Sequence, residues 1–231
     1  MTAPIPRVIF GALLCFVVSQ AQATIYSCVY KINVGYWSNV GNWTCYGVAD
    51  QVPDNSPPTR FFATISPSYG ANNISLDQSV TLDKLAIDGG ATLHILNNQI
   101  LTLDYSQDPT DQASGSGVSN VSGLLSIGST GSLTGLRLAG PQTIAANDGF
   151  GEITLSDNSL NIIEGVNGGG QDNLTLSAIN VTGSGQIGRN TLSLVTDGVV
   201  TADGTAGLTI DPDDAGSYPN RAPCAQSTAR R

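Results

Sequence analysis

The chain has 231 residues with 9 Lys or Arg, 18 Asp or Glu and one His, and its formal net charge is −9. So acidic a chain is a poor partner for nucleic-acid phosphates. One His and 12% charged residues leave few groups for acid–base or metal chemistry. Because 40% of the residues are hydrophobic, the composition also excludes a disordered acidic tail. We expect a folded protein with no cofactor.

The first 23 residues have the pattern of a secretory signal peptide. Arg7 is their only charged residue, an apolar run covers 8–18, and Ala21-Gln22-Ala23 matches an A-x-A cleavage site. The run is too short to span a bilayer, and no later stretch is long and apolar enough. We therefore expect a cleavable signal peptide over 1–23, no transmembrane segment in the mature chain, and a protein that is secreted or displayed on the outer cell surface.

Two cysteines, Cys28 and Cys45, follow soon after the cleavage site. In an oxidising compartment they predict a disulfide, and no nearby His or second Cys pair is present to complete a metal site. Closing a loop of this length contributes about 3 kcal/mol in the chain-entropy model.

Residues 71–211 consist of short runs that alternate apolar and polar residues, as half-buried strands do, between turns rich in Gly, Asn and Asp. The runs are 80–82, 85–87, 93–95, 101–103, 125–127, 136–138, 153–155, 160–162, 174–176, 192–194 and 208–210. With one strand per repeat, Leu138, Leu155, Leu176, Leu194 and Ile210 are spaced by 17, 21, 18 and 16 residues.

The recurring x-Leu-Thr/Ser-Leu signature and the scarcity of aromatic residues in this region favour an all-β fold, a right-handed parallel β-helix (solenoid) of about seven coils. An antiparallel β-sandwich is the alternative. A solenoid exposes apolar core and unpaired strands at its ends, and residues 24–70, which hold both Trp residues and the Cys pair, are expected to form the N-terminal cap.

The segment Tyr-Trp-Ser-Asn-Val-Gly-Asn-Trp at 36–43 resembles the W-x(n)-N-W opening of large exported bacterial β-solenoid proteins. These are autotransporter passengers, haemagglutinin-type adhesins and PEP-CTERM-type surface proteins. Val-Pro-Asp at 52–54, with Ala-Thr-Ile at 63–65, is similar to the next step of that pattern, and 80–93 and 185–212 resemble later coils. The resemblance marks Trp37, Asn42, Trp43 and Pro53 as motif residues and implies an exported solenoid.

Few residues suggest catalysis. His94 lies between two apolar residues of one strand, so we expect it to point away from the core, and no Ser or Asp stands at a triad spacing from it. A polysaccharide-active enzyme would need carboxylates on neighbouring coils, for which Asp83 and Asp88 are the candidates. Arg137 is expected to be a solvated charge on an outer face. We predict no catalytic, cofactor-binding or metal-binding residue.

The strand pattern stops near the C-terminus. Asp211, Asp213 and Asp214 form the one tight acidic cluster, and residues 167–172 are expected to be a plain turn, not a calcium loop. Residues 212–231 form an irregular tail with an unpaired Cys224. Either the chain is a truncated or frame-shifted piece of a longer repeat protein, or the tail is genuine.

Together these patterns predict a signal peptide over 1–23, a cap over 24–70, solenoid repeats over 71–211 and a tail over 212–231. The expected function is structural or adhesive and non-catalytic, with a polar Ser/Thr/Asn face that binds a glycan, a matrix or a cell-surface protein. The alternative is a polysaccharide lyase or hydrolase, or a carbohydrate-binding module, on the same fold.

Overall fold

The computed structural model describes residues 24–56, 59–70, 72–105, 117–167 and 171–213. The expected signal peptide, Asp214, Cys224 and nearly all of the tail lie outside these residues. Within them the regular structure is β, apart from two single 3-10 turns, η1 (Val40–Asn42) and η2 (Pro67–Tyr69).

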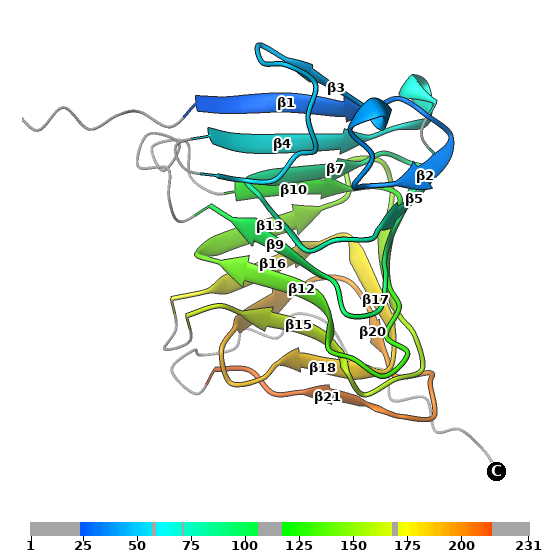
Figure 1. Ribbon diagram of the computed structural model, residues 1–231. Helices are drawn as coiled ribbons and strands as arrows, with labels where there is room; N and C mark the ends of the chain where they lie inside the picture. Colours follow the sequence, from blue (N-terminus) through cyan, green and yellow to red (C-terminus); the bar gives the residue numbers. More distant parts are fainter. Residues whose placement is uncertain (1–23, 57–58, 71, 106–116, 168–170, 214–231) are drawn as a thin grey trace, which may run out of the picture.

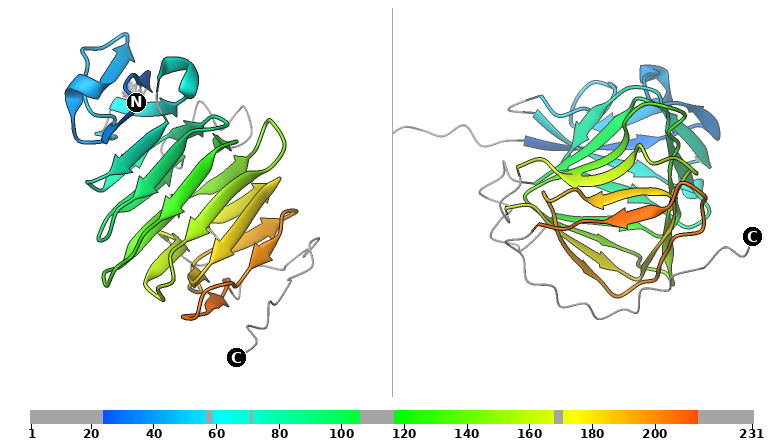
Figure 2. Two further views of the ribbon diagram at one scale, coloured as in Figure 1. Left: turned by 90° about the vertical axis from the view of Figure 1, so that its right-hand side faces the viewer. Right: turned by 90° about the horizontal axis from the view of Figure 1, so that it is seen from below.

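Three sheets form the three sides of the molecule, and the chain visits them in turn (Figures 1 and 2). Sheet A contains β1 (Thr24–Tyr30), β3 (Trp43–Tyr46), β4 (Thr59–Ile65), β7 (Lys84–Ile87), β10 (Gly117–Val121), β13 (Pro141–Ala145), β16 (Asn173–Ser177) and β19 (Ser193–Thr196). Sheet B contains β2 (Val34–Tyr36), β5 (Asn73–Leu76), β8 (Thr92–Ile95), β11 (Leu124–Ile127), β14 (Gly151–Leu155), β17 (Ile179–Gly183) and β20 (Val200–Thr201). Sheet C contains β6 (Val80–Leu82), β9 (Ile100–Asp104), β12 (Thr134–Ala139), β15 (Asn161–Gly165), β18 (Gly185–Gly188) and β21 (Leu208–Ile210).

Each coil after the first contributes one strand to each sheet, whereas the first contributes β1 to sheet A and β2 to sheet B but no strand to sheet C, so the 7-stranded sheet B corresponds to seven coils. Among the strand pairs of the described residues, only β1 with β3 is antiparallel, and every other named pair is parallel. The prediction of an all-β chain with stacked parallel strands is thus confirmed, and the antiparallel sandwich does not describe these sheets.

The core is a set of apolar columns in register along the coils. In sheet C, Val80, Leu101, Leu136, Ile163 and Ile187 stand on successive strands, and all are between 0% and 3% exposed. Burying one such side chain stabilises the fold by about 1.5–3 kcal/mol. Because the columns continue through neighbouring coils, each coil depends on the next to keep its side chains out of water.

The repeat spacing expected from the sequence is wrong. Leu138 lies in sheet C, Leu155 in sheet B, Leu176 and Leu194 in sheet A, and Ile210 again in sheet C. The same short apolar–polar signature recurs on all three sides of the solenoid. Of these successive matches only Leu176 and Leu194, on the paired strands β16 and β19, are one coil apart, and coil length varies with the length of the corners.

The structure corrects the expected strand at 160–162 as well. The strand begins at Asn161, and Ile163 rather than Ile162 is in register with Leu136 of the inward column. Sheet A also begins well before residue 71, because β1 pairs in parallel with β4 and β4 with β7. The first coils thus lie within the region expected to be only a cap.

Candidate functional site

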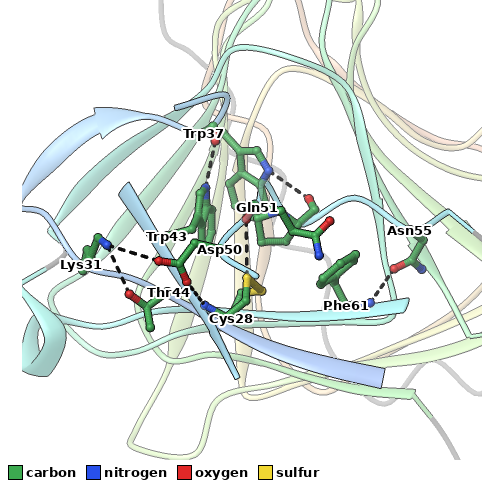
Figure 3. The surroundings of a disulfide bond; sticks show 11 residues. Cys28, Lys31, Trp37, Trp43, Thr44, Asp50, Gln51, Asn55 and Phe61 are labelled. Atoms are coloured by element: carbon green, nitrogen blue, oxygen red, sulfur yellow. Dashed lines mark hydrogen bonds and ion pairs between the residues drawn. A yellow bond between two sulfur atoms is a disulfide. The ribbon is translucent and has the colours of Figure 1, made fainter. Parts of the chain in front are cut away.

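Three aromatic residues of the N-terminal region, Tyr30, Trp37 and Trp43, form one buried cluster, and Figure 3 shows the two Trp side chains beside the disulfide. Tyr30, Trp37 and Trp43 are each 0% exposed. The Trp37 and Trp43 ring centroids are 4.5 Å apart at 65°, and Tyr30 meets Trp43 edge-on at 4.9 Å. Such edge-to-face pairs are favourable beyond the apolar area that they bury.

The four residues marked by the family resemblance are brought together here. The indole N–H of Trp37 donates to the carbonyl of Pro53 at 3.2 Å, and that of Trp43 donates to the carbonyl of Trp37 at 2.9 Å. Asn42 donates through Nδ2 to the Tyr30 hydroxyl at 2.7 Å. Because these polar groups find partners inside the cluster, the aromatic residues are buried without leaving a donor unsatisfied. Their arrangement accounts for a structural role.

A disulfide joins Cys28 of β1 to Cys45 of β3, as the sequence predicts. The two residues stand directly opposite each other in the antiparallel pair. Among the described residues no further strand pairs with the outer edge of β3, and the Cys45 amide donates instead to Asp50 Oδ1 at 2.9 Å. β3 therefore covers the edge of β1, which would otherwise be open to pairing with another chain.

The carboxylates considered for catalysis are not neighbours. Asp83 immediately precedes β7 and Asp88 immediately follows it, at opposite corners of one side of the same coil. Asp83 is 0% exposed and forms a buried ion pair with Arg60, whose side chain is 5% exposed. A paired carboxylate inside the fold has no access to a polysaccharide, so its geometry accounts for structure and not for the acid or base of a hydrolase.

Arg137 lies on an outer face with its side chain 39% exposed, as expected, but it is an ion-paired charge and not a free one. Its Nε lies 2.7 Å from Glu164 Oε1, and Arg189 Nη1 lies 2.5 Å from Glu164 Oε2. The Glu164 side chain is 8% exposed, whereas the two guanidinium side chains are 39% and 36% exposed. Arg137 and Glu164 share a register position on adjacent strands, which the sequence alone did not reveal because the coil lengths were unknown.

The described residues of the segment 167–172 form a corner held by a buried carboxylate. Asp172 is 0% exposed, and its oxygens accept hydrogen bonds from the Gly140 amide at 2.6 Å and the Asn167 amide at 2.5 Å. The Asp172 carboxylate therefore forms hydrogen bonds that hold the corner together.

The expected acidic cluster is described only in part. Within it, Asp213 is buried, with 4% of its surface exposed.

One outward column of sheet B differs from these structural groups. The registers of the seven strands align one residue per coil without an offset, and we call these residues the polar column. They are Tyr36, Ser75, His94, Ser126, Thr154, Thr182 and Thr201. Tyr36 is 59% exposed, and the others are half-buried. Figure 2 shows the strands of this sheet stacked side by side along the solenoid.

His94 lies in this column with its neighbours Leu93 and Ile95 turned into the core, each 0% exposed. The expectation that His94 points away from the core is thus confirmed. Burial lowers the pKa of His94 below its ordinary value, and the imidazole is therefore neutral at neutral pH.

The polar column is not used to hold the fold together. No side chain in it has a hydrogen bond to another described residue. The corners between sheets B and C behave in the opposite way: Asn161 alone donates to the carbonyls of Ser156, Asn158 and Ser184 at 2.6 to 3.0 Å and accepts from the Ser129 amide at 2.9 Å. The polar side chains of those corners form hydrogen bonds that hold the fold, whereas those of the polar column remain available to a ligand.

The described strands of sheet A offer no equivalent column. Its paired outward residues include Phe62 with Lys84 and Val118 with Thr143, which mix apolar, cationic and polar groups. The polar column of sheet B is therefore our candidate binding face. Sequence reasoning missed it, because its members come together only once the true coil lengths are known.

Comparison with protein-family models, with curated proteins and with solved structures found no match to this chain. In the part of the chain that the structure describes, no three His, Cys, Asp or Glu side chains meet in an arrangement able to hold a metal ion. Among those same residues there is no helix of the length and apolarity that crossing a membrane requires.

Proposed function

We propose that this protein is an exported, non-catalytic β-solenoid with a structural or adhesive role, secreted or displayed at the cell surface. In this proposal 1–23 is a cleavable signal peptide, the solenoid winds in the right-handed sense usual for parallel crossovers, and the aromatic and disulfide-linked residues form its cap. The ligand is a glycan, a matrix or another surface protein.

The observation that carries the proposal is the polar column, in which seven side chains in register make no hydrogen bond within the described protein. The donors and acceptors of these side chains are therefore not used within the described fold. Repeated presentation of the same polar groups along a stack of coils creates an extended surface, and an adhesive protein needs such a surface.

The first test is binding of the purified full chain to arrayed glycans and matrix proteins, with a paired charge substitution on each face. Thr154→Glu with Thr182→Glu changes two adjacent positions of the polar column on β14 and β17. Thr143→Glu with Thr175→Glu is the matched control, because it changes two adjacent half-buried threonines on β13 and β16 of sheet A. We expect binding to be lost only in the first variant.

Two further readouts separate adhesion from its alternatives. Incubation of bound glycans with the protein should release no shortened or unsaturated sugars, because the proposed function involves no catalytic residue. N-terminal sequencing of protein collected outside the cell should begin at Thr24. Release of sugar products, or binding lost equally in both double variants, would contradict the proposed function.

A further inference from the structure

The chemistry of the binding face specifies its ligand more narrowly. We propose that the polar column binds an uncharged, extended polysaccharide that lies along the solenoid axis, with one sugar ring packed on Tyr36. This inference rests on the proposed function, and it names the class of ligand, its direction and its anchoring residue.

Charge decides against an anionic ligand. The outward residues beside the polar column on the same strands are Val34, Asn73, Thr92, Leu124, Glu152 and Asn180. Neither this set nor the polar column contains Lys or Arg, and Glu152 is the one acid among them. A uronate, sulfate or phosphate would meet no counter-ion on this face and would be repelled by a chain of net charge −9. An uncharged polyol meets hydroxyl, amide and imidazole groups with which it exchanges hydrogen bonds.

Geometry decides the direction of the ligand. The polar column crosses the strands, so its side chains repeat at the strand separation of about 4.8 Å. This repeat is close to the length of one hexose unit in an extended chain. A polysaccharide laid along the solenoid axis therefore places successive sugars over successive coils. A peptide that binds by strand addition pairs with the edge of a sheet, and the face that carries the polar column does not offer it that mode.

Tyr36 supplies the apolar contact that a sugar ring requires. It stands on β2 at the N-terminal end of the polar column, paired in register with Ser75, and is 59% exposed. Val34, two residues away on the same strand, is 64% exposed and widens the apolar platform. A Tyr ring offers a rigid apolar face to the C–H groups of a sugar and a hydroxyl to its oxygens. The six half-buried polar residues below it then hold the rest of the chain.

Affinity electrophoresis of the full chain in gels that contain one dissolved polysaccharide tests this inference. Hydroxyethyl cellulose, mannan and laminarin are the uncharged probes, and alginate is the anionic probe. We expect retardation by at least one uncharged probe and none by alginate. Tyr36→Ala should weaken the binding at least about tenfold, as the loss of an aromatic anchor does. The control is Tyr46→Ala, because Tyr46 is 57% exposed but lies on β3 of sheet A; it should leave the affinity unchanged.

Each other outcome counts against a defined part of the proposal. Retardation by alginate that Thr154→Glu with Thr182→Glu abolishes would overturn the uncharged ligand while leaving the proposed adhesive function intact. Equal losses in Tyr36→Ala and Tyr46→Ala, or no loss in either, would overturn the anchor. Failure of every glycan and matrix protein to bind through sheet B would overturn both this inference and the proposed function. Thermal unfolding of each variant checks that the solenoid is intact.

Discussion

At the N-terminal end of the solenoid, Trp37 and Trp43 are 0% exposed and a disulfide joins the outermost strand to its neighbour, whereas in the last described coil Ile210 is 39% exposed. Ile210 is in register with Ile187, which is 1% exposed and continues the inward column of sheet C. The same column position is therefore sealed in one coil and open in the next.

The two regions share one apolar core, and they differ in what covers their outer ends. The cap relies on apolar burial, which is cooperative with the core beneath it. The last described coil also buries Leu192, Leu194 and Val200, but its outer end is held by side-chain hydrogen bonds. Asp157 accepts from the Thr205 hydroxyl at 2.5 Å, the Ala206 amide at 2.7 Å and the Ser184 hydroxyl at 2.9 Å. We therefore expect substitutions in the cap to act globally and those in the last described coil to act locally.

The largest effect is expected from Trp43→Ala. Removing a fully buried Trp opens a cavity between Tyr30 and Trp37 and should lower the free energy of unfolding by about 3–5 kcal/mol. Urea denaturation measures this loss. Trp43→Phe keeps most of the packing but loses the indole hydrogen bond to Trp37, so it should cost less and remain folded. An unfolding free energy unchanged by Trp43→Ala would show that the cap is not coupled to the solenoid.

The second effect comes from the disulfide. The bond links residues 17 apart in sequence. Replacing both cysteines by serine should lower the free energy of unfolding by about 3 kcal/mol, because the unfolded chain gains conformational entropy when the cross-link is removed. The melting temperature of the oxidised protein should fall on reduction with dithiothreitol, while that of the double-serine variant should not respond. A reductant response in the double-serine variant would place the sensitive thiol elsewhere in the chain.

The third effect is confined to the last described coil. Hydrogen bonds from Thr205, Ala206 and Ser184 hold the pKa of Asp157 well below its usual range. A lowered carboxyl pKa favours the folded state above the group's ordinary pKa, and this contribution is lost only as the pH falls through the lower folded value. Asp157→Ala should therefore reduce amide-exchange protection in β20 and β21 at neutral pH and leave β4 and β7 unaffected. In the unsubstituted protein the same loss should require strong acid. Equal loss in both regions would contradict a local role.

Sequence patterns predicted the structural features that depend on residues close together in the sequence. They missed the features that depend on how many residues each coil contains. The alternation of apolar and polar residues predicted that His94 lies on the outside of the fold. The expectation of an oxidising compartment predicted the disulfide between Cys28 and Cys45. The partners of Glu164 and Asp157 stand 25 to 49 residues away in the sequence. The corners of their coils differ in length, from the single residue Ser184 to the segment 202–207. No sequence period of fixed length aligns them, so the ion pairs, the corner hydrogen bonds and the polar column became visible only in three dimensions.

The smallest effect is expected from Ile210→Ala, and its comparison with Ile187→Ala separates the effect of burial from that of position in the column. Ile187→Ala removes a side chain that is 1% exposed and should cost about 2–5 kcal/mol, as buried Ile-to-Ala changes do. Ile210→Ala changes the same column one coil further on, where the side chain is 39% exposed, and should cost less than about 1 kcal/mol. Urea denaturation of both variants at two protein concentrations provides the comparison. A cost for Ile210→Ala that matches Ile187→Ala and grows with concentration would mean that a second molecule covers the last described coil in solution, because only association makes stability depend on concentration. A cost for Ile210→Ala that matches Ile187→Ala but is the same at both concentrations would instead place Ile210 inside the folded chain, and the contrast between the two ends would then have to be abandoned.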